Sequence, residues 1–98
     1  MYYCYILQSS HLHRFYFGYT LDLKQRINRH NAGQVTATKP GRPWKLVWYG
    51  AFDSLAEAKN FEKYLKTGSG KAFAYKRLVS EALSKDLRAR QTLPKLLA

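Results

Sequence analysis

Acidic residues are scarce in this chain, which has 6 Asp and Glu against 17 Lys and Arg and therefore a formal net charge of +11. A domain with so few acids repels other copies of itself, so we expect a polyanionic partner. The sequence leaves the oligomeric state open, and we assume a monomer. The phosphate backbone of nucleic acid is the commonest such partner. An anionic membrane surface would instead require a basic amphipathic helix with exposed apolar residues, and no such helix stands out in the sequence.

Cysteine and long apolar runs are also lacking. Cys4 is the one cysteine, so no internal disulfide can form, which suits a reducing compartment. The longest wholly apolar run, residues 1–7, is too short to span a membrane and has neither the basic segment nor the cleavage site of a signal peptide. We therefore expect a cytoplasmic protein with no membrane partner.

Apolar residues, in contrast, are plentiful at 46% of the chain, which is enough for the core of one compact domain. Three segments rich in aromatic and β-branched residues predict strands over 2–8, 15–20 and 44–49, the first two as a hairpin. Capping patterns and apolar spacing predict helices from residue 22 to about 33, over 54–66 and over 71–83.

The order of these segments predicts an α+β fold, in which a small three-stranded antiparallel sheet is covered by three or more helices. We expect residues 1–83 to form the domain. The remaining residues, 84–98, read as a basic C-terminal tail that is frayed or partly helical.

Arg26 and His30 lie four residues apart, so they share one face of the first expected helix. An Arg beside a neutral His suits phosphoryl chemistry, since the Arg stabilises charge on the phosphate oxygens and the His takes a proton from water. The same spacing is also typical of an ordinary solvated helix face, and the pair alone does not decide between the two interpretations.

Glu62 stands out because acids are rare and because it lies at the edge of the apolar stripe of its helix, between Ala58 and Leu65. A half-buried carboxylate needs a cation or a metal ion. Lys66, four residues later, could supply the cation. A hard divalent ion such as Mg²⁺ could instead bind through this one carboxylate, waters and substrate oxygens, and both readings remain open.

Gly68, Ser69 and Gly70 precede Lys71 in a segment that lacks the full pattern of a phosphate-binding loop. Its backbone amides and Lys71 can still bind a backbone phosphate. The residues that we expect to contact nucleic acid are Gly18, Lys24, Arg29, Lys39, Arg42 and Lys71.

Five short pieces of the chain, taken together, resemble the GIY-YIG nuclease family. Cys4-Tyr5-Ile6 resembles its first motif and Tyr16-Phe17-Gly18 its second. Leu23-Lys24-Gln25-Arg26 matches an L-x-x-R helix that has His30 four residues further on, and Glu62 matches a metal-binding glutamate on a later helix. The run from Glu62 through Thr67-Gly68 to Lys71 is similar to small stand-alone bacterial members, the UPF0213 group.

The resemblance implies hydrolysis of a phosphodiester with a single divalent metal, Mg²⁺ or Mn²⁺, on Glu62. It implies that Tyr5, Tyr16 or His30 activates water, that Arg26 holds the phosphate and that Gly18 lets backbone approach the substrate. Which of the three side chains is the base stays open.

Two positions depart from the family pattern. Residues 73–76 lack the Asn that many members carry, and Tyr19 and Thr20 stand where many have a Lys. Our hypothesis is a structure- or single-strand-selective endonuclease of low sequence specificity that acts on DNA more than RNA, for example in DNA repair. The alternative is a nucleic-acid-binding module without catalysis.

Overall fold

The computed structural model describes residues 1–97, with side chains as far as Arg88. Its strands are β1 (Tyr2–Ser9), β2 (Phe15–Thr20) and β3 (Trp44–Phe52). They form one antiparallel sheet in the order β2-β1-β3, with β1 and β2 joined as a hairpin. The predicted three-stranded α+β fold is therefore confirmed, although β3 continues three residues beyond its expected end.

Strand β1 is the centre of the molecule because it is buried on both faces. Tyr5 and Leu7 point to one face, where they pack with Trp44. Cys4 and Ile6 point to the other face and join the larger apolar cluster. The alternation of side chains along a strand explains how so short a segment supplies two cores.

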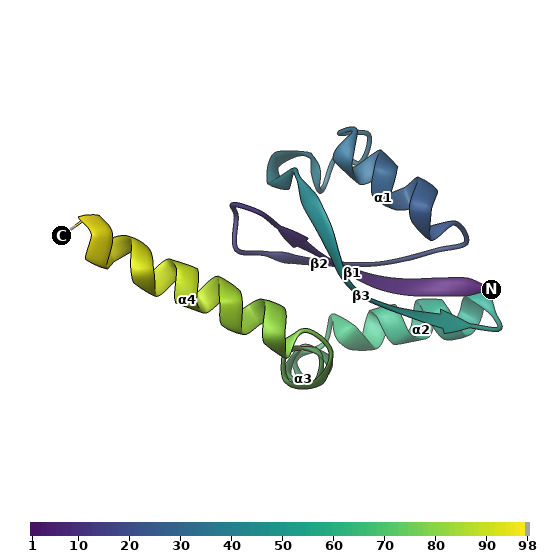
Figure 1. Ribbon diagram of the computed structural model, residues 1–98. Coiled ribbons are helices and arrows are strands. Elements are labelled where there is room, and N and C mark those ends of the chain that lie inside the picture. The colour runs from purple at the N-terminus through teal and green to yellow at the C-terminus, as the bar shows by residue number, and fades with distance from the viewer. Residues whose placement is uncertain (98) are drawn as a thin grey trace.

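Helices cover both faces of the sheet. Helix α1 (Leu23–Asn31) lies on the Tyr5 face and α2 (Leu55–Leu65) on the opposite face, as Figure 1 shows. Both helices begin at the caps that the sequence predicts. The side chain of Asp22 accepts a hydrogen bond from Gln25 N, and that of Ser54 accepts one from Glu57 N.

The helical region after α2 differs from the single helix expected over 71–83. Helix α3 (Gly68–Phe73) begins three residues earlier than expected and contains both Gly68 and Gly70. A π-helical turn, η2 (Ala74–Leu78), follows and then α4 (Ser80–Leu97), which projects away from the sheet in Figure 1. The expected tail thus lies in α4 as far as Leu97, and Ala98 lies outside the described residues.

The separation of α3 from α2 has a local cause. The side chain of Thr67 caps α3 by accepting a hydrogen bond from Gly70 N, so the chain turns sharply and starts a new helix. Within residues 1–97, no helix combines the length and the hydropathy that crossing a membrane requires.

Gly70 is where the turn between α2 and α3 requires glycine. A Cβ at this position would lie 1.7 Å from the backbone oxygen of Tyr64, whereas a Cβ at Gly68 would meet no atom within 4 Å. We therefore expect Gly70→Ala to lower the free energy of unfolding by about 2 kcal/mol or more. Gly68→Ala, the matched control, should leave it unchanged or raise it by up to about 1 kcal/mol. Urea denaturation of both variants checks this, and equal effects would contradict the close approach.

Candidate active site

A cleft of 310 Å³ opens beside β2, at the edge of the sheet where side chains from α1 and α2 meet. Tyrosine, arginine and glutamate line it, together with one glycine and one lysine. The full lining is Tyr5, Tyr16, Phe17, Gly18, Tyr19, Arg26, Glu62 and Lys66.

Gly18 gives Tyr5 access to this cleft. The two residues are partners in the β1–β2 ladder, and the Tyr5 ring lies directly over the glycine. A Cβ on residue 18 would come within 2.5 Å of Tyr5 Cζ and Oη. The missing side chain therefore lets the ring reach across β2, so a fully buried tyrosine still lines the cleft.

A chain of hydrogen bonds runs through the Tyr5 hydroxyl. Tyr5 Oη lies 2.8 Å from His30 Nε2 and accepts a hydrogen bond from Arg26 Nε at 3.4 Å. On the far side of the imidazole, His30 Nδ1 lies 2.7 Å from Thr38 Oγ1, which itself donates to the carbonyl of Val35. Because the single Thr38 hydroxyl proton goes to Val35, Thr38 accepts from His30 Nδ1–H. His30 Nε2 is then the free acceptor, and Tyr5 donates to it.

The loop after α1 fixes Thr38 behind the imidazole. Trp44 Nε1 donates to the Thr38 carbonyl at 2.6 Å, and the Asn31 side chain bonds both backbone groups of Trp44. Thr38 and His30 are both fully buried. The imidazole is therefore held in one orientation and one tautomer by residues from three parts of the chain.

Burial keeps His30 neutral. Loss of solvent, helped by the charges of Arg26 and Arg29, lowers the pKa of His30 from its usual 6.5 to about 4. Burial likewise raises the pKa of Tyr5 to about 12, against the opposing effect of the Arg26 hydrogen bond. At neutral pH the pair is thus a protonated phenol that donates to a neutral imidazole.

Glu62 lines the same cleft as Arg26, but it comes from α2 whereas Arg26 comes from α1. Its side chain is 8% exposed, and its Oε1 lies 2.7 Å from Lys66 Nζ. That hydrogen bond raises the pKa of Lys66, so the ammonium is charged at neutral pH. Cys4 lies in the core beneath α2. Its burial raises the pKa of the thiol to about 12, so the thiol stays protonated and unreactive at neutral pH.

The donor set of the cleft suits one kind of metal ion. Among the described residues no group of three or more His, Cys, Asp or Glu side chains comes together, so a site built wholly from protein ligands is not present there. Glu62 does offer one carboxylate, already paired with a cation, on a wall of the cleft. A hard divalent ion that keeps several waters and binds substrate oxygens fits such a site.

The five side chains expected to act together do meet here. Tyr5, Tyr16, Arg26 and Glu62 line the cleft, and His30 lies behind it on Tyr5. The Tyr16 and His30 rings are in edge contact, with centroids 5.0 Å apart. The structure thus settles where these residues lie, and their chemical roles remain predictions.

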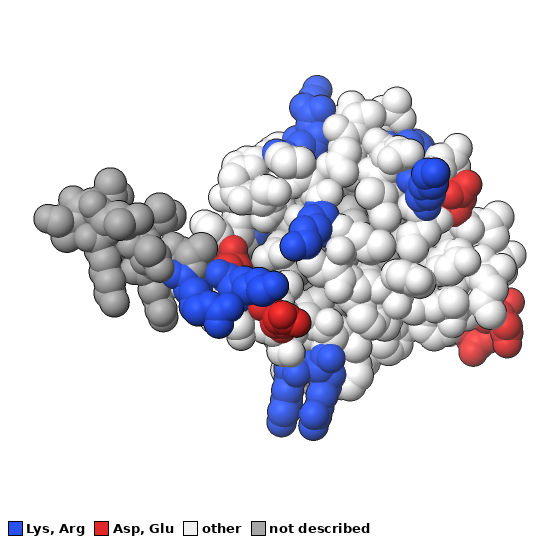
Figure 2. All heavy atoms as spheres, viewed as in Figure 1, with Lys and Arg blue, Asp and Glu red and all other residues white. Residues whose placement is uncertain are grey.

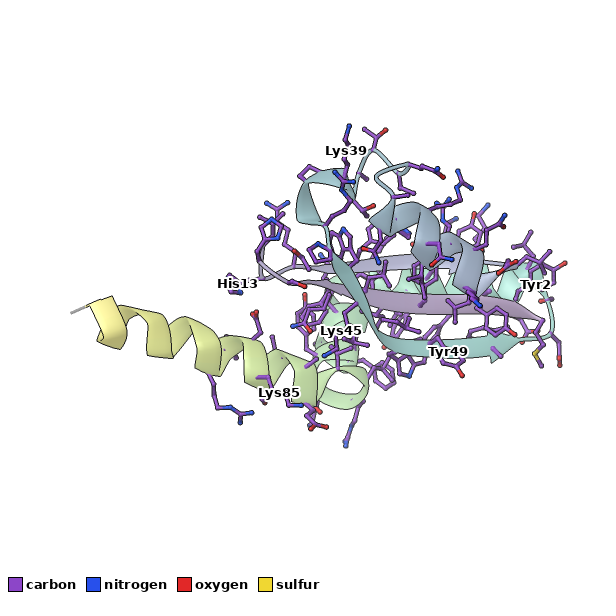
Figure 3. The ribbon with its side chains drawn as sticks, turned by 45° about the horizontal axis from the view of Figure 1, so that its top comes forward. Tyr2, His13, Lys39, Lys45, Tyr49 and Lys85 are labelled. Atoms are coloured by element: carbon purple, nitrogen blue, oxygen red, sulfur yellow. The ribbon has the colours of Figure 1, made fainter. Side chains whose placement is uncertain are left out.

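The residues expected to contact nucleic acid are more dispersed. Gly18 lines the cleft, whereas Lys24 and Arg29 line a groove on the outer side of α1. Lys39 and Arg42 line a third depression near the end of α1, and Lys71 is exposed on α3. Figure 2 shows cations scattered over one face of the molecule, and in Figure 3 Lys39, Lys45 and Lys85 lie on three separate elements.

The structure decides one interpretation that the sequence left open and corrects one expectation. A solvated helix face does not describe His30, which is fully buried and hydrogen-bonded to Thr38 in the loop after α1. Glu62 is 6% exposed rather than half-buried. Thr38 was missed altogether, since a threonine in a loop gives no signal. Lys66 was considered only as a surface partner of Glu62, although it also lines the cleft.

Comparison with known proteins yields a consistent family assignment. Residues 1–76 match the model of the GIY-YIG catalytic domain. The chain is similar to a UPF0213 protein from the ldhD 5′ region of Pediococcus acidilactici, 41% identical over 59 residues, which is 57% of this chain and 60% of that protein. It is 36% identical over 66 residues to a UPF0213 protein of Pediococcus pentosaceus, covering 66% of this chain and 68% of the relative.

A further UPF0213 protein, from Streptococcus agalactiae serotype V, is 40% identical over 65 residues, covering 65% of this chain and 73% of the relative. The chain therefore spans less than two thirds of the Pediococcus acidilactici protein and somewhat more of the other two. The family match over residues 1–76 contains every residue that lines the cleft.

The buried, neutral His30 predicts how stability depends on pH. Its pKa in the folded state, about 4, is below the usual 6.5, so the folded protein binds fewer protons than the unfolded chain between these values. This stability is present above about pH 6.5 and is lost as the pH falls towards 4, by about 3 kcal/mol. In urea denaturation across this range, the difference between wild type and His30→Gln should shrink accordingly. A difference that is constant with pH would contradict a neutral His30.

Proposed function

The chain belongs to the GIY-YIG family, and on this premise we propose that it is a metal-dependent endonuclease that hydrolyses nucleic-acid phosphodiesters. One observation carries the proposal: Arg26, Tyr5 and Glu62 line a single cleft, and Tyr5 is hydrogen-bonded to His30 behind it. Hydrolysis of a phosphodiester needs a cation for the phosphate, an acceptor for the water proton and electrostatic stabilisation of the developing charge. The cleft has a candidate for each.

Arg26 is the proposed phosphate ligand. Its Nε is held by Tyr5 Oη and the guanidinium also interacts with Tyr16, so the group is held at the cleft, where its terminal nitrogens can bind the substrate. A guanidinium tethered in this way loses little further freedom when an anion binds. Arg26 thereby orients the phosphate and stabilises the negative charge that builds on its oxygens.

Tyr5 and His30 are the proposed route for the proton. His30 is not among the residues that line the cleft, whereas Tyr5 lines it and is hydrogen-bonded to His30, so His30 acts through Tyr5. As the phenol oxygen takes a proton from the attacking water, its own proton passes to His30 Nε2. A phosphate on Arg26 neutralises one of the charges that depress the pKa of His30, so substrate binding itself makes the imidazole a better acceptor.

Tyr16 belongs to the same wall and contacts the His30 ring, but no hydrogen bond joins it to the imidazole among those of the described residues. This difference favours Tyr5 over Tyr16 as the residue that receives the proton. Tyr16 then contributes mainly by shaping the cleft and by its contact with Arg26.

Glu62 is the proposed ligand of the divalent ion, Mg²⁺ or Mn²⁺. When bound there, such an ion supplies positive charge to the phosphate oxygens and lowers the pKa of water. Glu62 is the one acidic residue among those that line the cleft, and its Oε1 is paired with Lys66 Nζ.

The proposed substrate is single-stranded or branched DNA, with RNA as the second choice, and the proposed setting is DNA repair in the cytoplasm. The dispersed cations support binding to a phosphate backbone in general. In the part of the chain that the structure describes, these cations lie on separate elements rather than along one helix that could enter the major groove and contact base edges. We therefore propose low sequence specificity.

A nucleic-acid-binding module without catalysis is the second candidate. It is favoured by the absence of the family Asn in residues 73–76 and of the Lys after the second motif. Such a module would bind nucleic acid with a steep dependence on salt and release no metal-dependent product.

Cleavage of labelled single-stranded, branched and duplex DNA, with and without Mg²⁺ or Mn²⁺, separates the two candidates. We expect Glu62→Gln and Arg26→Ala each to lower the rate of cleavage by about 100-fold or more, since the first removes the carboxylate proposed to hold the metal and the second removes the cation proposed to hold the phosphate. Lys59→Ala, a cation on α2 outside the cleft lining, is the matched control and should cut as wild type does. Activity that survives in Glu62→Gln would contradict the nuclease proposal.

A further inference from the structure

Lys66 and Glu62 form an i,i+4 ion pair in which the two side chains differ greatly in exposure. Lys66 Nζ lies 2.7 Å from Glu62 Oε1, yet the Lys66 side chain is 54% exposed whereas that of Glu62 is 8% exposed. Both residues line the same cleft. The ammonium therefore approaches the buried carboxylate from the cleft, on the side from which any substrate or ion would also have to come.

The cleft offers this ammonium more than one position. Lys66 is close enough to Tyr16 and Tyr19 on β2 to feel their electrostatic influence. Its four-carbon stem is flexible and its head is a compact charge that does not demand a fixed geometry. Arg26, by comparison, is tethered by Tyr5. Lys66 is thus the cation of the cleft lining that is free to change partner.

Glu62 cannot hold both cations at close range. An ammonium at hydrogen-bond distance and a divalent ion on the same carboxylate would repel each other strongly, because they share a partly buried site. When a divalent ion binds Glu62, Lys66 must therefore leave Oε1. The nearest anion for it is then a phosphate group in the cleft that Arg26 also faces.

We propose that Lys66 is an exchangeable counter-ion: it pairs with Glu62 in the metal-free protein, is displaced by the divalent cation and then binds the phosphate backbone of the substrate. This rests on the proposed function and adds to it a way in which metal and substrate binding are coupled. With Glu62 free of metal, Lys66 is neutralised and contributes little to nucleic-acid binding. With metal present, Lys66 becomes an additional ligand for phosphate, so binding of the metal and binding of the nucleic acid strengthen each other.

The first test measures Mn²⁺ affinity without nucleic acid, from the electron paramagnetic resonance signal of free Mn²⁺. Lys66→Met removes the competitor of the metal, so Mn²⁺ should bind about fivefold or more tightly than to wild type. Lys66→Arg keeps the competing charge and should stay near wild type. Lys63→Met removes a charge one residue from Glu62 on an exposed side of α2 and controls for net charge.

The second test measures the affinity for a phosphorothioate single strand as a function of salt. With Mn²⁺ present, wild type should form about one more phosphate contact than Lys66→Met, and its salt slope should be steeper by about 0.7. Without Mn²⁺ the two slopes should coincide. Slopes that differ equally with and without Mn²⁺ would overturn the exchange, since Lys66 would then contact phosphate at all times.

The outcomes also distinguish this inference from the proposed function. If Glu62→Gln abolishes Mn²⁺ binding but Lys66→Met does not strengthen it beyond Lys63→Met, the exchange is wrong and the metal site on Glu62 stands. If Glu62→Gln binds Mn²⁺ as wild type does, the metal site itself is wrong and both proposals fall.

Discussion

The hydrogen bond between Tyr5 Oη and His30 Nε2 is the interaction on which the rest of the site depends. It joins the central strand to α1, and it exists because Gly18 leaves room for the Tyr5 ring and Thr38 fixes the imidazole from behind. Buried polar groups of this kind are stable only when each is satisfied, and here every donor has an acceptor: Arg26 to Tyr5, Tyr5 to His30, His30 to Thr38 and Thr38 to Val35. Two members of this network, Tyr5 and Arg26, line the cleft.

The protein has few acidic residues, and one of them lies at this site. Six Asp and Glu against seventeen Lys and Arg give a net positive charge that attracts polyanions, and the cleft lining contains a single carboxylate, Glu62. Two cations then play different parts. Arg26 is tethered by its hydrogen bond to Tyr5, whereas Lys66 has an exposed side chain that is paired with Glu62. The proposed chemistry and the proposed exchange both follow from this difference.

Much of this arrangement was predictable from the sequence because it depends on local patterns. Alternating aromatic residues predicted the strands, and Asp22 and Ser54 predicted the starts of α1 and α2. The order of Tyr5, Tyr16, Arg26, His30 and Glu62 predicted a common site, and the resemblance to the GIY-YIG family that they carry is confirmed by the match over residues 1–76. What could not be predicted depends on tertiary contacts. The loop after α1 supplies Thr38, which is hydrogen-bonded to the buried His30. Gly70 packs against the backbone carbonyl of Tyr64, and Lys66 pairs with Glu62 at the cleft.

The central claim is that the Tyr5 hydroxyl takes the proton of the attacking water and passes its own to His30. Tyr5→Phe tests it most directly, since Phe preserves the ring over Gly18 and removes only the oxygen that joins Arg26, His30 and the cleft. The measurement is the single-turnover rate of DNA cleavage at saturating protein and metal. We predict a rate about 100-fold or more below wild type, with nucleic-acid affinity little changed. A rate equal to that of wild type would show that the proton leaves by another route and would contradict the account.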